Sequence, residues 1–281
     1  MDTNAKRIHH YHANAHALGG HLERPVAQHV PIQVPSSLSP VGGYSSSKTG
    51  EFHLQGILSF KGASTQVAGS RNRNGAWTTL VTSVVEGVNV LEVITADRLV
   101  AQISLEHPLE GYQPKVTFAG TRFENLRVAG HRVDPVTNLD LCSTRPTTAE
   151  GYPTVSCLAH KGFMDTVAEH YNHMSDPNYL PKWVTNRTIP AWVQDRYKGS
   201  AAPRAGRDVV VCSLVKEITG QFPGAPYGHV IEVPEFGKAF LAELVVDHNS
   251  FQLSMLRLEL GCGTDGSVDV GSGRGNGTTY P

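Results

Sequence analysis

Hydrophobic and polar residues alternate along several segments of the chain. In residues 52–60, four apolar side chains fall on one face of an extended backbone and polar side chains on the other, and residues 98–106 repeat this pattern. A period of two residues is typical of a β-strand with one buried face. Further strands are expected at 77–85, 90–94, 115–118, 123–128 and 229–233, with a turn at 87–89.

The second half of the chain continues this pattern. Residues 208–217 are apolar on both faces and predict a central strand that is covered twice. Residues 240–247 alternate, Asp247 to Ser250 form a turn, and residues 256–260 return, which predicts a hairpin. We therefore predict an all-β fold, a β-sandwich or jelly roll of roughly ten strands.

One long segment departs from the strand pattern. It is rich in proline and polar residues, and it contains a predicted helix from Lys161 to Met174 with an apolar stripe. The glycine-rich C-terminus predicts an extended tail or a loosely added strand. The expected organisation is a His-rich polar arm (1–50), the first half of the sandwich (51–134), a helix-containing insertion (135–207), the second half (208–262) and a Gly-rich tail (263–281).

Composition limits the classes of partner. The net charge of −1 provides no basic surface for nucleic acid, so none is expected. No segment approaches the roughly 20 apolar residues of a membrane span. Because no signal peptide is visible, we expect a cytoplasmic protein, although an exported origin stays open.

Three segments carry a resemblance to known proteins: VLEVITADRLVAQIS, FAGTRFENLRVAGHRVD and GHVIEVPEFGKAFLAELVVDHNSFQLSMLRLELG. The chain resembles a family of uncharacterised bacterial proteins of similar length and, more distantly, the choice-of-anchor P domain. The turn from Thr95 to Asp97 and the segment from Asn125 to Val133 are its most recognisable parts. The resemblance implies an all-β fold and supplies no catalytic residue or cofactor.

The densest group of candidate ligands is HHYHANAH, with His9, His10, His12 and His16. Neutral imidazoles bind zinc, copper or nickel, so a divalent transition metal is the candidate cofactor. In a helix His9, His12 and His16 would share a face, whereas in a strand His10, His12 and His16 would. The alternative is a polar arm that pairs with the sheet or with a neighbouring subunit.

Two further groups have the spacing of metal ligands. Asp165, Glu169 and His173 lie on one face of the predicted helix, which suits either a divalent ion or a solvated surface. Asp265 and Asp269 form one imperfect glycine-aspartate unit, and calcium is not expected there because such sites need stacked repeats.

Catalytic patterns are weak. Glu243 and Glu259 project from the two arms of the predicted hairpin and resemble a glycosidase pair, but either a cross-strand salt bridge with Arg257 or plain solvation is the preferred interpretation. No G-x-S-x-G motif occurs. The tryptophans are too scattered along the sequence to indicate a carbohydrate-binding face: Trp77, Trp183 and Trp192.

None of the cysteines belongs to a C-x-x-C pair. Disulfides joining Cys142 to Cys157 and Cys212 to Cys262 suit an oxidising compartment, and free buried thiols are the expectation otherwise.

The function that these observations favour is a non-enzymatic structural or binding module that self-associates through exposed strand edges and polar termini. The alternative is a metal-binding protein that uses the histidine cluster. A third hypothesis is a cupin-like metalloenzyme, although no histidines and acid on adjacent inward-facing strands are visible.

Overall fold

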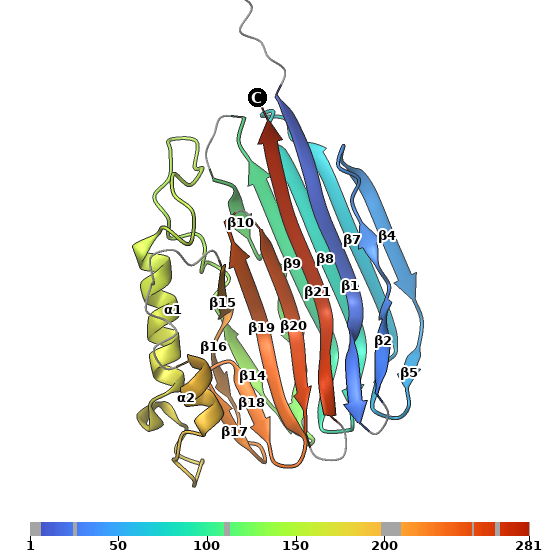
Figure 1. Cartoon of the computed structure of the whole chain (residues 1–281), viewed down its shortest axis with the longest axis vertical. Coiled ribbons are helices and arrows are strands. Elements are labelled where there is room, and N and C mark those ends of the chain that lie inside the picture. The colour runs from blue at the N-terminus through green and yellow to red at the C-terminus, as the bar shows by residue number, and fades with distance from the viewer. Residues whose placement is uncertain are drawn as a thin grey trace, which may run out of the picture.

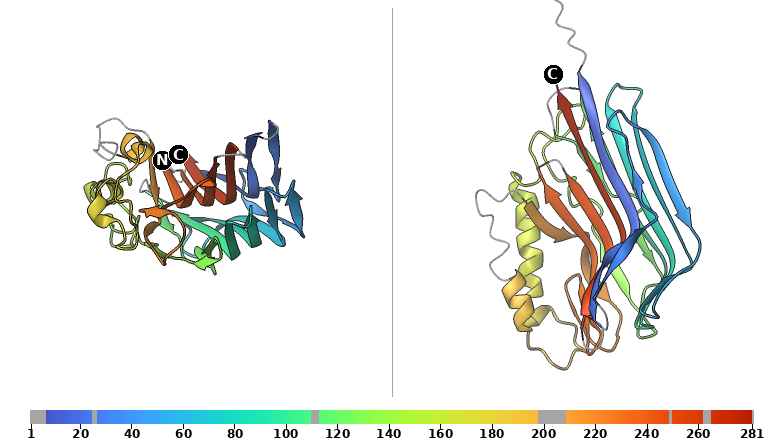
Figure 2. Two further views of the ribbon diagram at one scale, coloured as in Figure 1. Left: turned by 90° about the horizontal axis from the view of Figure 1, so that it is seen from below. Right: turned by 45° about the vertical axis from the view of Figure 1, so that its right-hand side comes forward.

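The protein is a sandwich of two antiparallel sheets with a helical insertion along one side (Figures 1 and 2). The structure, a computed structural model, describes residues 7–24, 27–109, 113–197, 209–248, 250–261 and 265–280. The all-β fold with a helix-containing insertion, predicted from the sequence, is confirmed.

The first sheet has nine strands within the described residues, in the order β17-β18-β19-β20-β21-β1-β2, with β15 paired to β19 and β3 to β1. Its strands are β1 (Ile8–Arg24), β2 (Gln28–Gln33), β3 (Ser36–Ser37), β15 (Val209–Ser213), β17 (Ala225–Tyr227), β18 (Val230–Val233), β19 (Gly237–Asp247), β20 (Phe251–Leu260) and β21 (Asp265–Tyr280).

The second sheet has ten strands in the same part of the chain, and β8 and β9 form its centre. Its strands are β4 (Gly43–Thr49), β5 (Phe52–Leu54), β6 (Leu58–Phe60), β7 (Gly62–Arg71), β8 (Trp77–Val90), β9 (Ile94–His107), β10 (Lys115–Thr117), β11 (Arg122–Glu124), β12 (Arg127–Val128) and β13 (His131–Arg132). A separate pair joins β14 (Asp134–Thr137) to β16 (Val215–Thr219).

The insertion between β14 and β15 carries the helices α1 (Lys161–Met174) and α2 (Ala191–Tyr197) and the short 3₁₀ helix η1 (Pro177–Tyr179). The sequence predicted α1 with these bounds, and the apolar stripe that begins at Phe163 is buried. The Nδ1 atom of His160 accepts a hydrogen bond from the backbone N–H of Phe163 at 3.2 Å and caps the helix. No described helix is long and apolar enough to cross a membrane.

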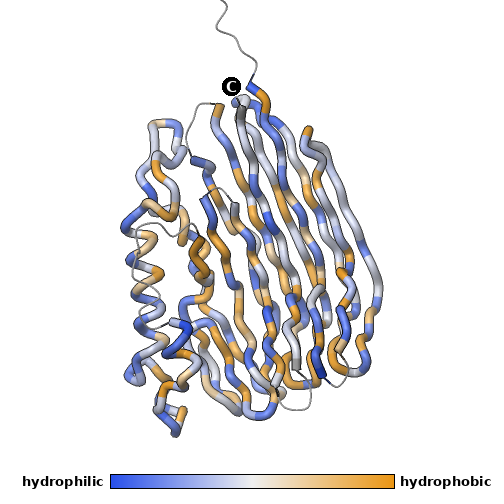
Figure 3. The backbone as a smooth tube through the Cα atoms, viewed as in Figure 1, coloured by the Kyte–Doolittle hydropathy of each residue, from blue (hydrophilic) through white to orange (hydrophobic). Residues whose placement is uncertain are grey.

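The core lies between the two sheets, where β1, β20 and β21 contact β8 and β9. The long strands change between hydrophobic and hydrophilic from residue to residue (Figure 3), because only one face of each points into the sandwich. Phe60, Leu99, Ile103 and Leu105 are at most 1% exposed. Burial of this apolar surface is the main force that holds the sheets together.

Both termini form strands of the first sheet, in line with the alternatives of an N-terminal segment that pairs with the sheet and a C-terminal added strand; a free arm and a free tail are not what the described residues form. β1 covers most of the first half of the expected arm, and the expected glycine-rich tail contains β21. The two strands pair antiparallel from Ile8↔Tyr280 to Arg24↔Asp265 and lie between β20 and β2 (Figure 1). Alanines and glycines occupy many of their inward positions, and these small residues let the two layers approach closely. The hydrophobic pattern was too weak to show this.

Three strand predictions need correction. Residues 52–60 form a tight hairpin of β5 and β6. The turn expected at 87–89 lies at Leu91 and Glu92, which have positive φ angles of 51° and 58°. Residues 208–217 are not one central strand, because the chain bends at Leu214 between β15 and β16, and Val209 and Val211 are 45% and 42% exposed.

A crease crosses the first sheet. One row of residues crosses four strands: Ala242 on β19, Met255 on β20, Gly271 on β21 and Ala17 on β1. The row lies between the register pairs Glu243↔Ser254 and Leu241↔Leu256 and the pairs that extend these two onto β21 and β1. Ala242 and Gly271 have φ angles of 45° and 65°, in the left-handed region that glycine adopts most easily. At least three successive residues of each strand are buried here, so the alternation of faces is interrupted and reset.

The crease decides which polar residues share the outer face. Ser254 and Arg257 are three residues apart and would point to opposite faces of a regular strand. Both instead line one cavity with Glu243 and Asp269. The fold thereby gathers charged side chains from three adjacent strands on the side of the sheet where the insertion lies.

Candidate functional site

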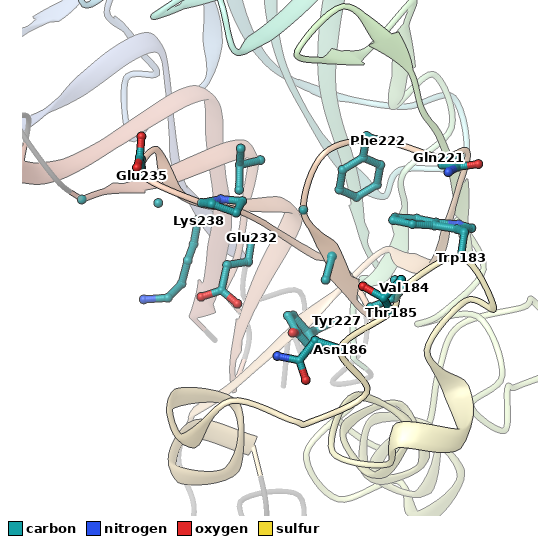
Figure 4. Close-up of a pocket in the computed structure, with 16 residues that line it drawn as sticks. Trp183, Val184, Thr185, Asn186, Gln221, Phe222, Tyr227, Glu232, Glu235 and Lys238 are labelled. Atoms are coloured by element: carbon teal, nitrogen blue, oxygen red, sulfur yellow. The ribbon is translucent and has the colours of Figure 1, made fainter.

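Two hollows lie where the insertion meets the first sheet. One is an open cleft of about 590 Å³ at the end of the sheet (Figure 4). The other is a cavity of about 470 Å³ between α1, α2, β15 and the outer face of β19–β21. A chain of ion pairs connects their linings.

Aromatic rings form one wall of the cleft. Trp183, from the insertion, packs edge-on against Phe222 with ring centroids 5.1 Å apart. Tyr227, from β17, points into the same region, and burial is the main cause that raises its pKa to about 12, so the hydroxyl stays protonated. Trp183 keeps part of its surface exposed while Phe222 and Tyr227 are buried, so Trp183 is the ring that a ligand would touch.

Polar groups line the cleft beside these rings and opposite them. Asn186 and Gln221 carry exposed amides, and Glu235 and Glu232 carry carboxylates (Figure 4). The Nε1 atom of Trp192 donates to Oε1 of Glu232 at 2.8 Å, which fixes that carboxylate.

Lys238 links the cleft to the interior. Its Nζ lies 4.9 Å from the ring centroid of Trp192 and 3.5 Å from Oε2 of Glu259. Glu259 also accepts hydrogen bonds from Arg196 at 2.8 Å and from Arg257 at 2.7 Å. Burial alone would raise the pKa of Glu259, but these two guanidinium groups lower it, so the group is an anion at neutral pH.

Arg257 and Glu243 form the buried centre of the network. The Nε and Nη2 atoms of Arg257 donate to the two carboxylate oxygens of Glu243, and the guanidinium lies 3.7 Å from the ring centroid of Phe240. Burial tends to raise the pKa of Glu243, but its contacts with His229 and Arg257 lower it to about 2. Of the two interpretations that the sequence left open, a salt bridge with Arg257 or solvation, the structure shows the salt bridge, and Arg257 also pairs with Glu259.

Two histidines extend the network under α1. The Nε2 atom of His170 lies 3.0 Å from Nδ1 of His229, and Nε2 of His229 lies 3.9 Å from Oε1 of Glu243, beyond hydrogen-bond range. Burial, followed by the neighbouring His229, lowers the pKa of His170 to about 3. Both imidazoles therefore have a place in a buried polar chain that ends at the Glu243 carboxylate.

The histidines of the N-terminal cluster point to two faces of β1. His10 and His12 are exposed and His16 is half-buried on the outer face, as expected for a strand, whereas His9 is buried between the sheets. His9 stacks on Trp77 at 5.1 Å, and its Nδ1 lies 2.9 Å from Oγ1 of Thr279. The four imidazoles thus do not converge, and metal binding by this cluster stays a prediction.

The helical candidate ligands have other partners. Asp165 pairs with Lys161, and His173 lies 3.8 Å from Glu169 while its ring stacks on Tyr179. Across the described ranges, no three His, Cys, Asp or Glu side chains are arranged to hold a metal ion. The arrangement is that of a solvated helix face.

The cysteines Cys142, Cys157 and Cys212 are free and buried, in line with the expectation of free thiols. The thiols of Cys142 and Cys157 are hydrogen-bonded to each other, and that bond lowers the pKa of Cys157. Cys262, the partner suggested for Cys212, lies outside the described residues.

Sequence reasoning missed Trp183 and Trp192 at the cleft and Asp269 at the cavity. The tryptophans are far from Glu232 and Lys238 in the sequence, and only the fold of the insertion brings them together. The local signal lay in residues 183–192. This segment contains two tryptophans, an asparagine and a proline, which is unusual for a loop exposed to solvent.

A family model described as domain of unknown function (DUF8256) matches residues 9–247. No curated protein and no solved structure gives a match to the chain. The matched residues run from β1 to the end of β19 and include the cleft residues Trp183 and Lys238, while Arg257 and Asp269 lie beyond them. Because the model matches most of the chain, the protein belongs to the family described as domain of unknown function (DUF8256).

Proposed function

We propose that the protein is a non-enzymatic binding module and that its ligand, a neutral oligosaccharide, occupies the cleft beside Trp183. The observation that carries the proposal is the meeting of a partly exposed indole ring with amides and carboxylates in one open cleft (Figure 4). The C–H face of a sugar ring packs on an aromatic ring. Its hydroxyl groups donate and accept hydrogen bonds, which amides also do.

Several side chains of the cleft are held in place by other residues of the protein, which favours binding without a rearrangement of the cleft. Glu232 is held by Trp192, and Lys238 is held between Trp192 and Glu259. Groups that are already ordered lose less conformational entropy when a ligand arrives. The charges of Glu232 and Lys238 are also partly balanced locally, which suits an uncharged ligand.

The test is a titration with cellotetraose, xylotetraose and maltotetraose, followed by calorimetry and tryptophan fluorescence. We expect at least one of them to bind, and Trp183→Ala to weaken that binding about tenfold or more, which is about 1.4 kcal/mol. Tyr44→Ala, on the far strand β4, removes an exposed ring outside the cleft and should leave binding unchanged. Equal affinity of the Trp183→Ala variant and the wild type would refute the proposal.

Self-association is a second candidate, favoured by the edge strand β4. Among the described residues β4 pairs only with β7, and Tyr44 near its start is 64% exposed. An unpaired edge offers backbone groups to the β4 strand of a second copy, although Lys48 opposes such pairing. Light scattering at tens of micromolar should give a dimer that Tyr44→Lys weakens, and a monomer would exclude this mode.

A further inference from the structure

The cavity between α2 and the creased sheet contains one carboxylate, that of Asp269, which accepts no side-chain hydrogen bond from the described residues. Arg196 and Arg257 are matched in charge by Glu243 and Glu259, which accept their hydrogen bonds. Asp269, on β21, is the remaining charged residue in the lining. Because Lys238 also lies 3.5 Å from Glu259, the three cations and three carboxylates of this network balance. Asp269 is distinguished by its lack of a hydrogen-bond donor, not by an excess of charge.

Arg257 cannot satisfy Asp269 fully. The two residues are directly opposite each other on β20 and β21, but the guanidinium group directs Nε, Nη1 and Nη2 to Glu243 and Glu259. No side chain in the described ranges donates a hydrogen bond to the Asp269 carboxylate. Burial, the largest cause, raises its pKa to about 6 even though the Arg257 charge lowers it. The group therefore ionises at neutral pH in surroundings that stabilise the anion poorly.

A second polar group in the lining is also unsatisfied. The Tyr197 hydroxyl is fully buried and has no hydrogen-bond partner among the described residues, while the whole residue is 4% exposed. Burial raises the pKa of Tyr197, so the hydroxyl keeps its proton and its oxygen is free to accept a hydrogen bond. An unpaired buried hydroxyl costs free energy that a ligand donor would recover.

The rest of the lining is partly apolar. Val209, Val211 and Val245 form one side, and the two valines of β15 are 45% and 42% exposed. Such a wall suits an alkyl chain rather than a hydrated ion, since burying apolar surface is favourable. We propose that this cavity binds a small organic cation, with a primary ammonium group at Asp269 and Tyr197 and a short alkyl body against the valines.

The test uses n-butylammonium chloride as the probe, with butan-1-ol as its uncharged counterpart and sodium chloride to match ionic strength. Amide chemical shifts of residues 252–257 and 267–270 report binding. We expect butylammonium to bind at least tenfold more tightly than butanol. Equal binding of the two, or shifts that sodium chloride reproduces, would overturn the proposal.

Two variants locate the charge. Asp269→Asn should weaken butylammonium binding at least tenfold, whereas Glu235→Gln, an exposed carboxylate of the cleft, should not change it. Tyr197→Phe removes only the unpaired hydroxyl, so it should fold as the wild type does and bind severalfold more weakly, which keeps the test decisive if Asp269→Asn misfolds. Unchanged binding by Tyr197→Phe together with unchanged or unmeasurable Asp269→Asn would reject the assignment.

This site is independent of the oligosaccharide cleft. Trp183→Ala should leave butylammonium binding intact, and Asp269→Asn should leave oligosaccharide binding intact. Failure of either proposal is therefore separable from failure of the other.

Discussion

The pairing of Glu243 with Arg257 shows how one buried residue constrains the whole polar network. Glu243 is 7% exposed, and its two oxygens accept both guanidinium donors from one side. Two charges removed from water are costly, and their mutual contact offsets that cost only while both are present. Removal of Glu243 deprives Arg257 of two of its hydrogen bonds and leaves it only Glu259, and removal of Arg257 leaves the buried Glu243 without its cation.

Glu243→Gln should therefore lower the free energy of unfolding by about 3–5 kcal/mol, because Arg257 would keep its charge without its bidentate partner. Urea denaturation at neutral pH measures the change. The matched control is Glu124→Gln, which breaks the exposed pair with Arg122 at 2.7 Å and should cost less than about 1 kcal/mol. An equal loss of unfolding free energy in the two variants would show that the buried pair contributes no more to stability than the exposed one.

At the scale of elements, α1 was predictable and the terminal strands were not. The stripe from Phe163 to Met174 is a local pattern of period 3.6 with a long polar face, so neighbouring residues contain the whole signal. The strands β1 and β21 instead depend on each other. Their inward positions hold alanine and glycine, whose small side chains carry little hydrophobic signal but fit between closely packed sheets.

The candidate site was predictable only where its residues share a hairpin. Glu243, Arg257 and Glu259 lie on β19 and β20, and their cross-strand pairing was expected. Asp269 lies directly opposite Arg257 and so shares its face. Glu243 joins that face only because the crease at Ala242 resets the alternation of β19, and this depends on a backbone conformation without a sequence pattern. The cleft could not be predicted, because it depends on the path of the insertion through space, and no local sequence pattern gives that path.

The close packing of β21 can be tested at Gly277. A β-carbon there would lie 2.4 Å from Cε1 of His9 and 2.9 Å from Cε1 of His107, and both rings are buried. Gly277→Ala should cost about 1–3 kcal/mol of unfolding free energy because the rings must shift. Gly50→Ala, where no atom lies within 4 Å, should change stability by less than about 0.5 kcal/mol. A neutral Gly277→Ala variant would mean that the sheets separate easily.

At the scale of the molecule, buried imidazoles occupy both ends of the sandwich. His9 and His107 lie between the sheets, with ring centroids 4.7 Å apart, and His170 lies on α1, in the insertion, against His229. Burial is the main cause that lowers the pKa values of His9, His107 and His170 to about 4, 3 and 3. The folded protein therefore keeps all three neutral where an unfolded chain would protonate them.

This difference predicts acid sensitivity with a definite window. Above pH 6.5 both states hold these imidazoles neutral, so they add no pH dependence. Below it only the unfolded chain gains the protons, and each histidine then lowers the free energy of unfolding by about 1.4 kcal/mol per pH unit until its folded pKa is reached. Asp269 acts in the opposite direction between pH 6 and 3.8, because its pKa is raised on folding. Three histidines outweigh that one carboxyl.

Urea midpoints measured from pH 7.5 down to pH 5 should therefore fall steadily, with the steeper part below pH 6.5. His107→Gln should flatten the profile, because one of the three groups no longer takes up a proton in the unfolded state, whereas His131→Gln, at an exposed position, should leave its slope unchanged. A midpoint that is constant or rises over this range would mean that the imidazoles are hydrated or protonated in the folded protein. The two ends of the sandwich would then not be closed as the packing of His9, His107 and His170 requires.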